Sequence, residues 1–167
     1  MSRSETNETG TNSSGTQRVP TSQTVTRLAL GAAMTFAGVG HLTFARQDFQ
    51  AQVPDWVPFS KDFTVLASGV VEVAFGAALL GLPKHRALVG GALAAFYVAV
   101  FPGNISQYLN HRDAFGLDTD TKRLVRLFFQ PPLVAAALWA GGWTPSRIKL
   151  VASALTRRTR RGRDGQR

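Results

Sequence analysis

The sequence contains no cysteine, so disulfide bonds, thiolate nucleophiles and cysteine-ligated zinc or iron–sulfur centres are excluded. Its histidines, His41, His85 and His111, are far apart and form no ligand motif, and we therefore predict no metal site. Glycine-rich phosphate loops, nucleophile elbows and HExxH motifs are also missing. The sequence therefore contains no recognisable catalytic motif and identifies no catalytic residue, and we expect at most an accessory oxidoreductase subunit.

Formal charge is nearly absent from four long stretches, residues 28–45, 63–82, 87–109 and 127–146, where the one charged residue is Glu72. A helix that crosses a membrane needs about 20 mostly apolar residues, whereas a soluble amphipathic helix keeps a charged face. We therefore predict an all-α protein, a bundle of four transmembrane helices, in preference to a soluble bundle. The expected domain is residues 25–144, with spans at about 26–45, 62–82, 86–108 and 122–144.

The two ends of the sequence are polar. Residues 1–24 are rich in Ser, Thr, Asn and Gly, and we expect them to be disordered. Residues 145–167 hold most of the formal charge of +9 and form the predicted basic tail. Part of this tail is expected to be an amphipathic helix on anionic lipid, or a solvated tail, because apolar residues recur at helical spacing at Ile148, Val151, Ala152 and Leu155. No nucleic-acid partner is expected, because no folded reader adjoins the basic run.

Several residues mark expected helix ends. Ser60 and Asp62 can cap the second span, and Gly81 followed by Pro83 is a stop signal. The short basic turn at residues 83–86 predicts that the second and third spans are antiparallel neighbours. Prolines inside the third and fourth spans predict kinks at Pro102, Pro131 and Pro132.

Lysine and arginine placement predicts the orientation. The basic tail and the 83–86 turn lie on one side, whereas Arg112, Lys122 and Arg123 lie on the other. Because the tail outweighs these three, we predict a multi-pass protein of the bacterial inner membrane with both termini in the cytoplasm.

With this topology, each span places its most polar residues toward the outer leaflet, often on faces made of Gly, Ser and Ala. A charge at the bilayer centre costs at least about 2.5–3.5 kcal/mol, so such groups are usually paired or functional. Glu72 could be neutralised by Arg126 or His41, or it could be protonated, because desolvation raises the pKa of a carboxyl group. The predicted ligand-binding residues are His41, Trp56, Glu72, Tyr97, Asn104, Arg126 and Gln130. The alternative is polar contacts that only hold helices together.

The connection at residues 49–60 is too apolar for a free loop and too rich in proline for a helix. Pro54 and Pro58 flank Trp56 in it. We predict a segment folded over the outer mouth of the bundle, with Trp56 in the interfacial aromatic belt. An ordinary anchoring tryptophan, with no site beneath it, is the alternative.

Four motifs in order resemble the DoxX-like family of small bacterial membrane proteins. They are "GVGHLTFARQDFQAQVPDWVP" (38–58), "SGVVEVAFGAALL" (68–80), "FPGNISQY" (101–108) and "RLFFQPP" (126–132). The resemblance covers about residues 27–143 and implies a four-helix integral membrane protein. The family takes its name from a subunit of a quinone-linked sulfur-oxidising complex. Relatives more often have His-Phe where His41-Leu42 stand and Ala where Gly103 stands, which bears on the shape of the pocket.

Three functions fit these observations. The first is a subunit or accessory protein of membrane redox metabolism that binds a quinone-like head group, with a redox protein as partner. The second is a structural or partner-binding membrane protein without its own activity. The third is transport of a small solute or proton, which would require a homo-oligomer because four short helices leave little room for a pathway. Beyond the quinone of the first hypothesis, no cofactor is expected.

Overall fold

The computed structural model describes residues 19–149 and Ser153, and all regular structure in that part of the chain is helical. The all-α prediction is therefore confirmed for the described residues, whereas residues 1–18 and most of the basic tail lie outside them. The helices are α1 (Thr21–Leu42), α2 (Arg46–Gln50), α3 (Lys61–Gly81), the 3-10 turn η1 (Pro83–His85), α4 (Arg86–Leu109) and α5 (Asp120–Ala140). Residues 145–149 form a further helical stretch within the predicted amphipathic part of the tail.

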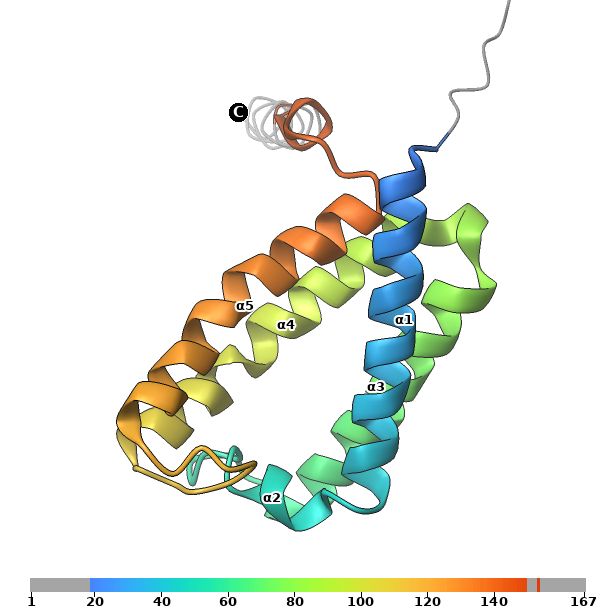
Figure 1. Ribbon diagram of the computed structural model, residues 1–167. Coiled ribbons are helices and arrows are strands. Elements are labelled where there is room, and N and C mark those ends of the chain that lie inside the picture. The colour runs from blue at the N-terminus through green and yellow to red at the C-terminus, as the bar shows by residue number, and fades with distance from the viewer. Residues whose placement is uncertain (1–18, 150–152, 154–167) are drawn as a thin grey trace, which may run out of the picture.

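The long helices form two pairs, α1 with α3 and α4 with α5 (Figure 1). The pairs meet at the end where η1 joins α3 to α4, and they diverge toward the other end, where α2 and the two longer connections lie. The η1 turn is as tight as predicted, but the expectation that α3 and α4 pack as neighbours is wrong over most of their length. Each of them has its main partner elsewhere, because α1 and α5 offer the closer fit.

Glycines bring the backbones of α1 and α3 into direct contact. A Cβ atom on Gly38 would lie 2.7 Å from the Gly69 carbonyl oxygen and 2.7 Å from the Val73 nitrogen. A Cβ atom on Gly69 would lie 2.7 Å from the Cβ of His41. Such close approach requires residues without side chains, as in other small-residue helix contacts. The predicted small-residue faces of His41 and Glu72 therefore face each other.

The first helix begins at Thr21, earlier than the expected residue 26, and the predicted disordered tail is therefore too long. Its first turns are held by buried polar contacts. The Arg27 guanidinium donates to the Leu79 carbonyl near the end of α3, and Arg86 Nη1 donates to Gln23 Oε1 at 3.0 Å. Carbonyls at a helix C-terminus attract a cation, which explains why Arg27 is buried without an acidic partner.

The expected helix ends agree with the structure at α3. The Ser60 hydroxyl accepts a hydrogen bond from the Phe63 nitrogen at 3.2 Å, and α3 ends at Gly81. Thr119, rather than a neighbouring aspartate, caps α5 by accepting from the Lys122 nitrogen. Both α4 and α5 continue through their prolines without ending.

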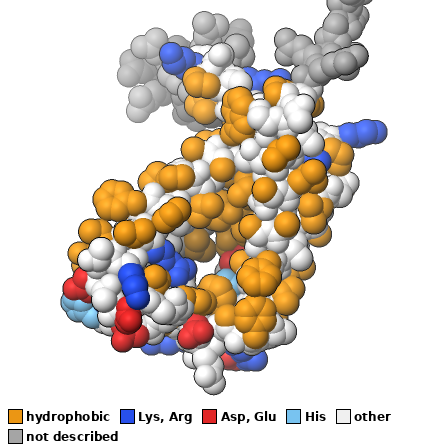
Figure 2. Space-filling view, viewed as in Figure 1, with side chains coloured by type: hydrophobic (Ala, Val, Ile, Leu, Met, Phe, Trp, Pro, Cys, Tyr) orange, Lys and Arg blue, Asp and Glu red, His pale blue; other side chains and the backbone are white. Residues whose placement is uncertain are grey.

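The outer surface of the bundle is apolar. Phe36, Leu88, Val98 and Phe128 are each more than half exposed, and Figure 2 shows hydrophobic side chains along the length of the visible helices. The interior instead holds buried polar residues from all four long helices. Two segments, Lys61–Gly81 and Pro83–Leu109, are long and apolar enough to cross a membrane.

Charge divides the described bundle into two ends. The described chain begins and finishes at the end near η1 (Figure 1), and the charged side chains described there are all basic, namely Arg27, Lys84, Arg86, Arg147 and Lys149. Except for Glu72, the acidic residues in the described part belong to the opposite end, where all but Asp48 form ion pairs with basic residues.

We predict that Gly38→Ala and Gly69→Ala each lower the free energy of unfolding by about 1–3 kcal/mol, because the new methyl groups meet backbone or a tightly packed Cβ. Gly81→Ala is the matched control, since nothing lies within 4 Å of its Cβ position. Thermal and denaturant unfolding in detergent would measure this. Equal stability of all three variants would contradict the close α1–α3 contact.

Candidate functional site

A cavity of about 420 Å³ lies between the two helix pairs, toward the end where they diverge. Figure 2 shows the molecule hollowed between the pairs. One side of the cavity is covered by residues 51–60, which we call the strap. The structure brings together on this one cavity all of the residues predicted for the site, His41, Trp56, Glu72, Tyr97, Asn104, Arg126 and Gln130.

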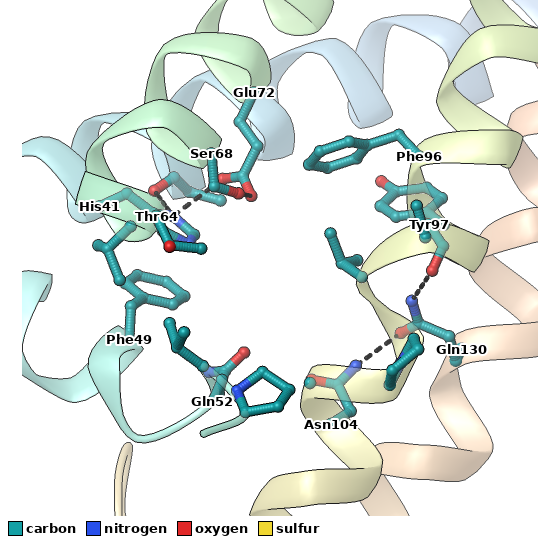
Figure 3. Close-up of a pocket in the computed structure, with 18 of the residues that line it drawn as sticks. His41, Phe49, Gln52, Thr64, Ser68, Glu72, Phe96, Tyr97, Asn104 and Gln130 are labelled. Carbon is teal, nitrogen blue, oxygen red and sulfur yellow. Dashed lines mark hydrogen bonds and ion pairs between the residues drawn. The ribbon is translucent and has the colours of Figure 1, made fainter. Parts of the chain in front are cut away.

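Glu72 and His41 form the polar part of the α1–α3 wall (Figure 3). His41 Nδ1 lies 2.9 Å from Glu72 Oε2, and both side chains are about nine-tenths buried. The Ser68 hydroxyl, one turn earlier on α3, donates to Glu72 Oε1 at 3.2 Å. Of the partners expected for Glu72, His41 is therefore the one that the structure provides.

The His41 ring is fixed from two sides. Its Nδ1 lies 2.9 Å from the Ala37 carbonyl oxygen, and its plane stacks on Phe49 with ring centroids 3.3 Å apart. Because a carbonyl can only accept, this contact assigns the proton to Nδ1. Glu72 Oε2 is close to the same nitrogen but receives no well-directed hydrogen bond among the described residues. The two side chains are therefore in close contact, and no hydrogen bond to His41 Nε2 is found among the described residues.

The α4–α5 wall is held by amide side chains. Asn104 Nδ2 donates to Gln130 Oε1 at 3.1 Å, and Gln130 Nε2 donates to the Tyr97 carbonyl at 2.7 Å (Figure 3). The backbone contact of this wall is made by Gln130, which reaches across from α5. The Tyr97 hydroxyl donates to the Met34 sulfur at 3.1 Å and so links this wall to α1.

Arg126 does not pair with Glu72, contrary to one of the two pairings we considered. Its guanidinium carbon lies 5.3 Å from the centre of the Phe115 ring. Phe115 meets Phe49 edge-on at 4.5 Å, and Phe49 stacks on His41. This chain of aromatic contacts, supplied by α2 and the 110–119 connection, links Arg126 to the His41 side of the cavity.

The strap is fastened to the other long connection. Arg112 Nη1 donates to the Val53 carbonyl at 2.9 Å, and Arg112 Nη2 lies 2.5 Å from Asp55 Oδ2. Lys61 adds a second ion pair to Asp55, at 3.0 Å. The expected cover over this end of the bundle is therefore present. Trp56 lines the cavity but is 72% exposed, so most of its ring faces outward.

A second contact determines how closely the strap approaches α4. A Cβ atom on Gly103 would lie 2.8 Å from the Gln52 carbonyl oxygen. An alanine at this position would push the strap away from α4. Gly103 therefore allows the strap to lie close to α4 where it covers the cavity.

Sequence reasoning missed several lining residues. Ser68 is one of them, and its four-residue offset from Glu72 on the same helix is the signal that could have placed it in the site. Phe49 and Gln52 belong to a short helix and a loop, where no periodic pattern indicates which side chain turns inward. Phe115 has a positive φ of 55°, a conformation that sequence alone does not reveal.

Comparison with protein families gives one match. Residues 30–141 match a family model described as a domain of unknown function (DUF8561), which covers more than half of the chain. The chain therefore belongs to this family, and the matched region contains every residue predicted for the site. No curated protein and no solved structure matches the chain.

We predict that Asp55→Asn loosens the strap. Hydrogen bonding from Lys61, helped by the charge of Arg112, lowers the pKa of Asp55. The contacts that stabilise the strap are therefore complete above about pH 4, the ordinary aspartate value, and are lost as the pH falls through the lower folded-state pKa.

Hydrogen exchange followed by mass spectrometry would measure the effect. At neutral pH, exchange in residues 51–60 should be faster in Asp55→Asn than in the wild type, with α1 and α3 unchanged. Asp48→Asn is the control, because Asp48 is exposed and has no ion pair in the described structure. Unchanged exchange in the strap would show that Asp55 does not fasten it.

Proposed function

We propose that this chain is a four-span membrane protein of the DoxX-like kind that binds a quinone-like head group as a subunit or accessory of membrane redox metabolism. The observation that carries the proposal is the cavity, in which polar groups from both helix pairs face one another inside a bundle with an apolar exterior.

The distribution of side chains supports a membrane location. In water, Phe36, Val98 and Phe128 would be expected to turn inward, and Glu72, Asn104 and Gln130 outward, but the exposures are the reverse. The long helices have 22, 21, 24 and 21 residues. At 1.5 Å per residue, such helices are about 31–36 Å long, enough for a hydrocarbon core of about 30 Å.

Charge placement supports the proposed orientation. The three basic residues on the side predicted to be external each form an ion pair with an aspartate at the same end of the bundle. The pairs are Arg112 with Asp55, Lys122 with Asp118, and Arg123 with Asp113 and Asp120. The basic residues near η1 have no acidic neighbours of this kind among the described residues. The η1 end is thus the more positive end, as expected of the cytoplasmic side.

The chemistry of the cavity suits a flat ring with oxygen atoms at its edges. Apolar side chains such as Phe96, Val100 and Leu133 line much of the surface and can hold the ring. On one wall, His41 and Glu72 can exchange a proton with a ring oxygen. On the other, Arg126 can donate hydrogen bonds. These groups would orient a quinone head group, while the hollow between the helix pairs gives a lipid-soluble molecule a path of entry.

A structural function is favoured for one part of the site. Asn104 donates to Gln130, and Gln130 donates to the Tyr97 carbonyl of α4, so these amide groups bond within the α4–α5 pair. If the whole site were structural, the same would be expected of Arg126, yet among the described residues its guanidinium has no hydrogen-bond acceptor and contacts the Phe115 ring.

We predict that purified protein in detergent binds a short-chain alkyl-1,4-benzoquinone saturably, and that Glu72→Gln weakens binding of its reduced form about tenfold, because the charged acceptor for a ring hydroxyl is lost. Isothermal titration under anaerobic conditions would measure both forms. Asp118→Asn is the control, since it removes one carboxylate at an exposed position outside the cavity. Absence of saturable binding to the wild-type protein would refute the proposal.

We also predict the topology. A phosphatase fusion after Arg167 should be inactive and a fluorescent-protein fusion there should be fluorescent, because the C-terminus is proposed to be cytoplasmic. Insertion of the phosphatase into the exposed connection after Gly116 should give the opposite pattern. An active phosphatase at Arg167 would reverse the proposed orientation.

A further inference from the structure

Arg126 differs from the other arginines of the helical bundle. Between residues 21 and 140, every other arginine side chain donates a hydrogen bond to a carboxylate, an amide oxygen or a backbone carbonyl. These residues are Arg27, Arg46, Arg86, Arg112 and Arg123. Within the described residues, the Arg126 guanidinium has no such acceptor and contacts the Phe115 ring.

The position of Arg126 makes this lack of an acceptor costly. Its side chain lines the cavity and is only partly exposed. A guanidinium carries five N–H donors and is always charged, and its transfer out of water is unfavourable unless an acceptor or a counter-ion replaces the lost hydration. An arginine whose role was to hold helices together would be expected to use those donors within the protein.

Glu72 is not placed to supply the counter-charge. Its carboxylate contacts His41 and Ser68, and no hydrogen bond or ion pair joins it to Arg126 among the described residues. The other polar groups on the cavity wall of α4 and α5 are neutral, and two of them, Asn104 and Gln130, bond to each other. The acceptor that matches Arg126 is therefore missing from the protein part of the site.

We propose that Arg126 anchors an anionic oxygen of the ligand, so that the cavity selects an amphipathic ring compound with an ionised acidic group over its neutral analogue. The proposal rests on the proposed function and gives the chemical class of its ligand. A planar guanidinium can bind a delocalised oxyanion through two parallel hydrogen bonds. A hydroxyl group conjugated to a quinone carbonyl is such an acid, because the negative charge is shared between the two oxygens.

Three probes with the same alkyl tail separate charge from shape: an alkyl-benzoquinone, its 2-hydroxy derivative and its 2-methoxy derivative. At neutral pH, the hydroxyl compound is an anion, whereas the methoxy compound is neutral and similar in shape. We expect the wild-type protein in detergent to bind the hydroxyl compound on the order of 10- to 100-fold more tightly than the methoxy compound.

Variants test whether Arg126 is responsible for the preference for the hydroxyl compound. Arg126→Gln should abolish it, and Arg126→Lys should reduce it, because lysine keeps the charge but loses the two-pronged geometry. Arg147→Gln should preserve it, since it removes the same charge from an exposed position outside the cavity. Equal binding of the two compounds by the wild-type protein, or a preference that survives Arg126→Gln, would overturn the assignment.

Thermal unfolding without ligand provides a second readout. Arg126→Gln should be at least as stable as the wild type, because no acceptor is left behind, whereas Arg112→Gln should be less stable because it releases Asp55 and the Val53 carbonyl. A loss of stability in Arg126→Gln comparable to that in Arg112→Gln would assign Arg126 to structure instead. If none of the three probes binds, the proposed quinone function itself fails. If all three bind equally, only the anion selectivity fails.

Discussion

The contact between the backbones of α1 and α3 determines where the rest of the site lies. Gly38 and Gly69 allow the two helices to approach so closely that His41 and Glu72, one turn along from each glycine, meet across the contact. Beyond the η1 turn, α3 makes few contacts with α4. The second pair, α4 with α5, is held together by its own contacts, including the Gln130 bond to the Tyr97 carbonyl. The space between the two pairs becomes the cavity.

A space between diverging helices would collapse unless its open end were supported. The strap and the 110–119 connection provide this support, because Arg112 joins them through the Val53 carbonyl and Asp55. Arg123, which is 5% exposed, contacts Asp113 and Asp120 beneath them. The charged network thus lies at one end of the bundle, and the apolar surface lies along its length. This division accounts for a chain of near-neutral mean hydropathy that still has two helices apolar enough to span a membrane.

The sequence was informative wherever a local pattern decides the structure. The apolar runs, the Ser60 cap and the stop at Gly81 predicted the long helices, and their phases placed His41, Glu72, Asn104 and Gln130 toward one another. Pairing of the helices depended on which glycine faces match in three dimensions, so the tight turn at η1 wrongly suggested that α3 and α4 pack together. The contact of Arg126 with Phe115 depends on the 110–119 connection, where no periodic pattern places the side chains.

The buried His41–Glu72 pair on one wall and Arg126 on the other, which has no acceptor among the described residues, are the features expected of a ligand-binding cavity. A map of the protein purified with its native lipids, from crystals or single particles, would test this most directly. The account predicts density for a ring-shaped molecule between Glu72 and Arg126, with an oxygen atom within hydrogen-bonding distance of the guanidinium. A collapsed cavity with Arg126 bonded directly to Glu72 would contradict it.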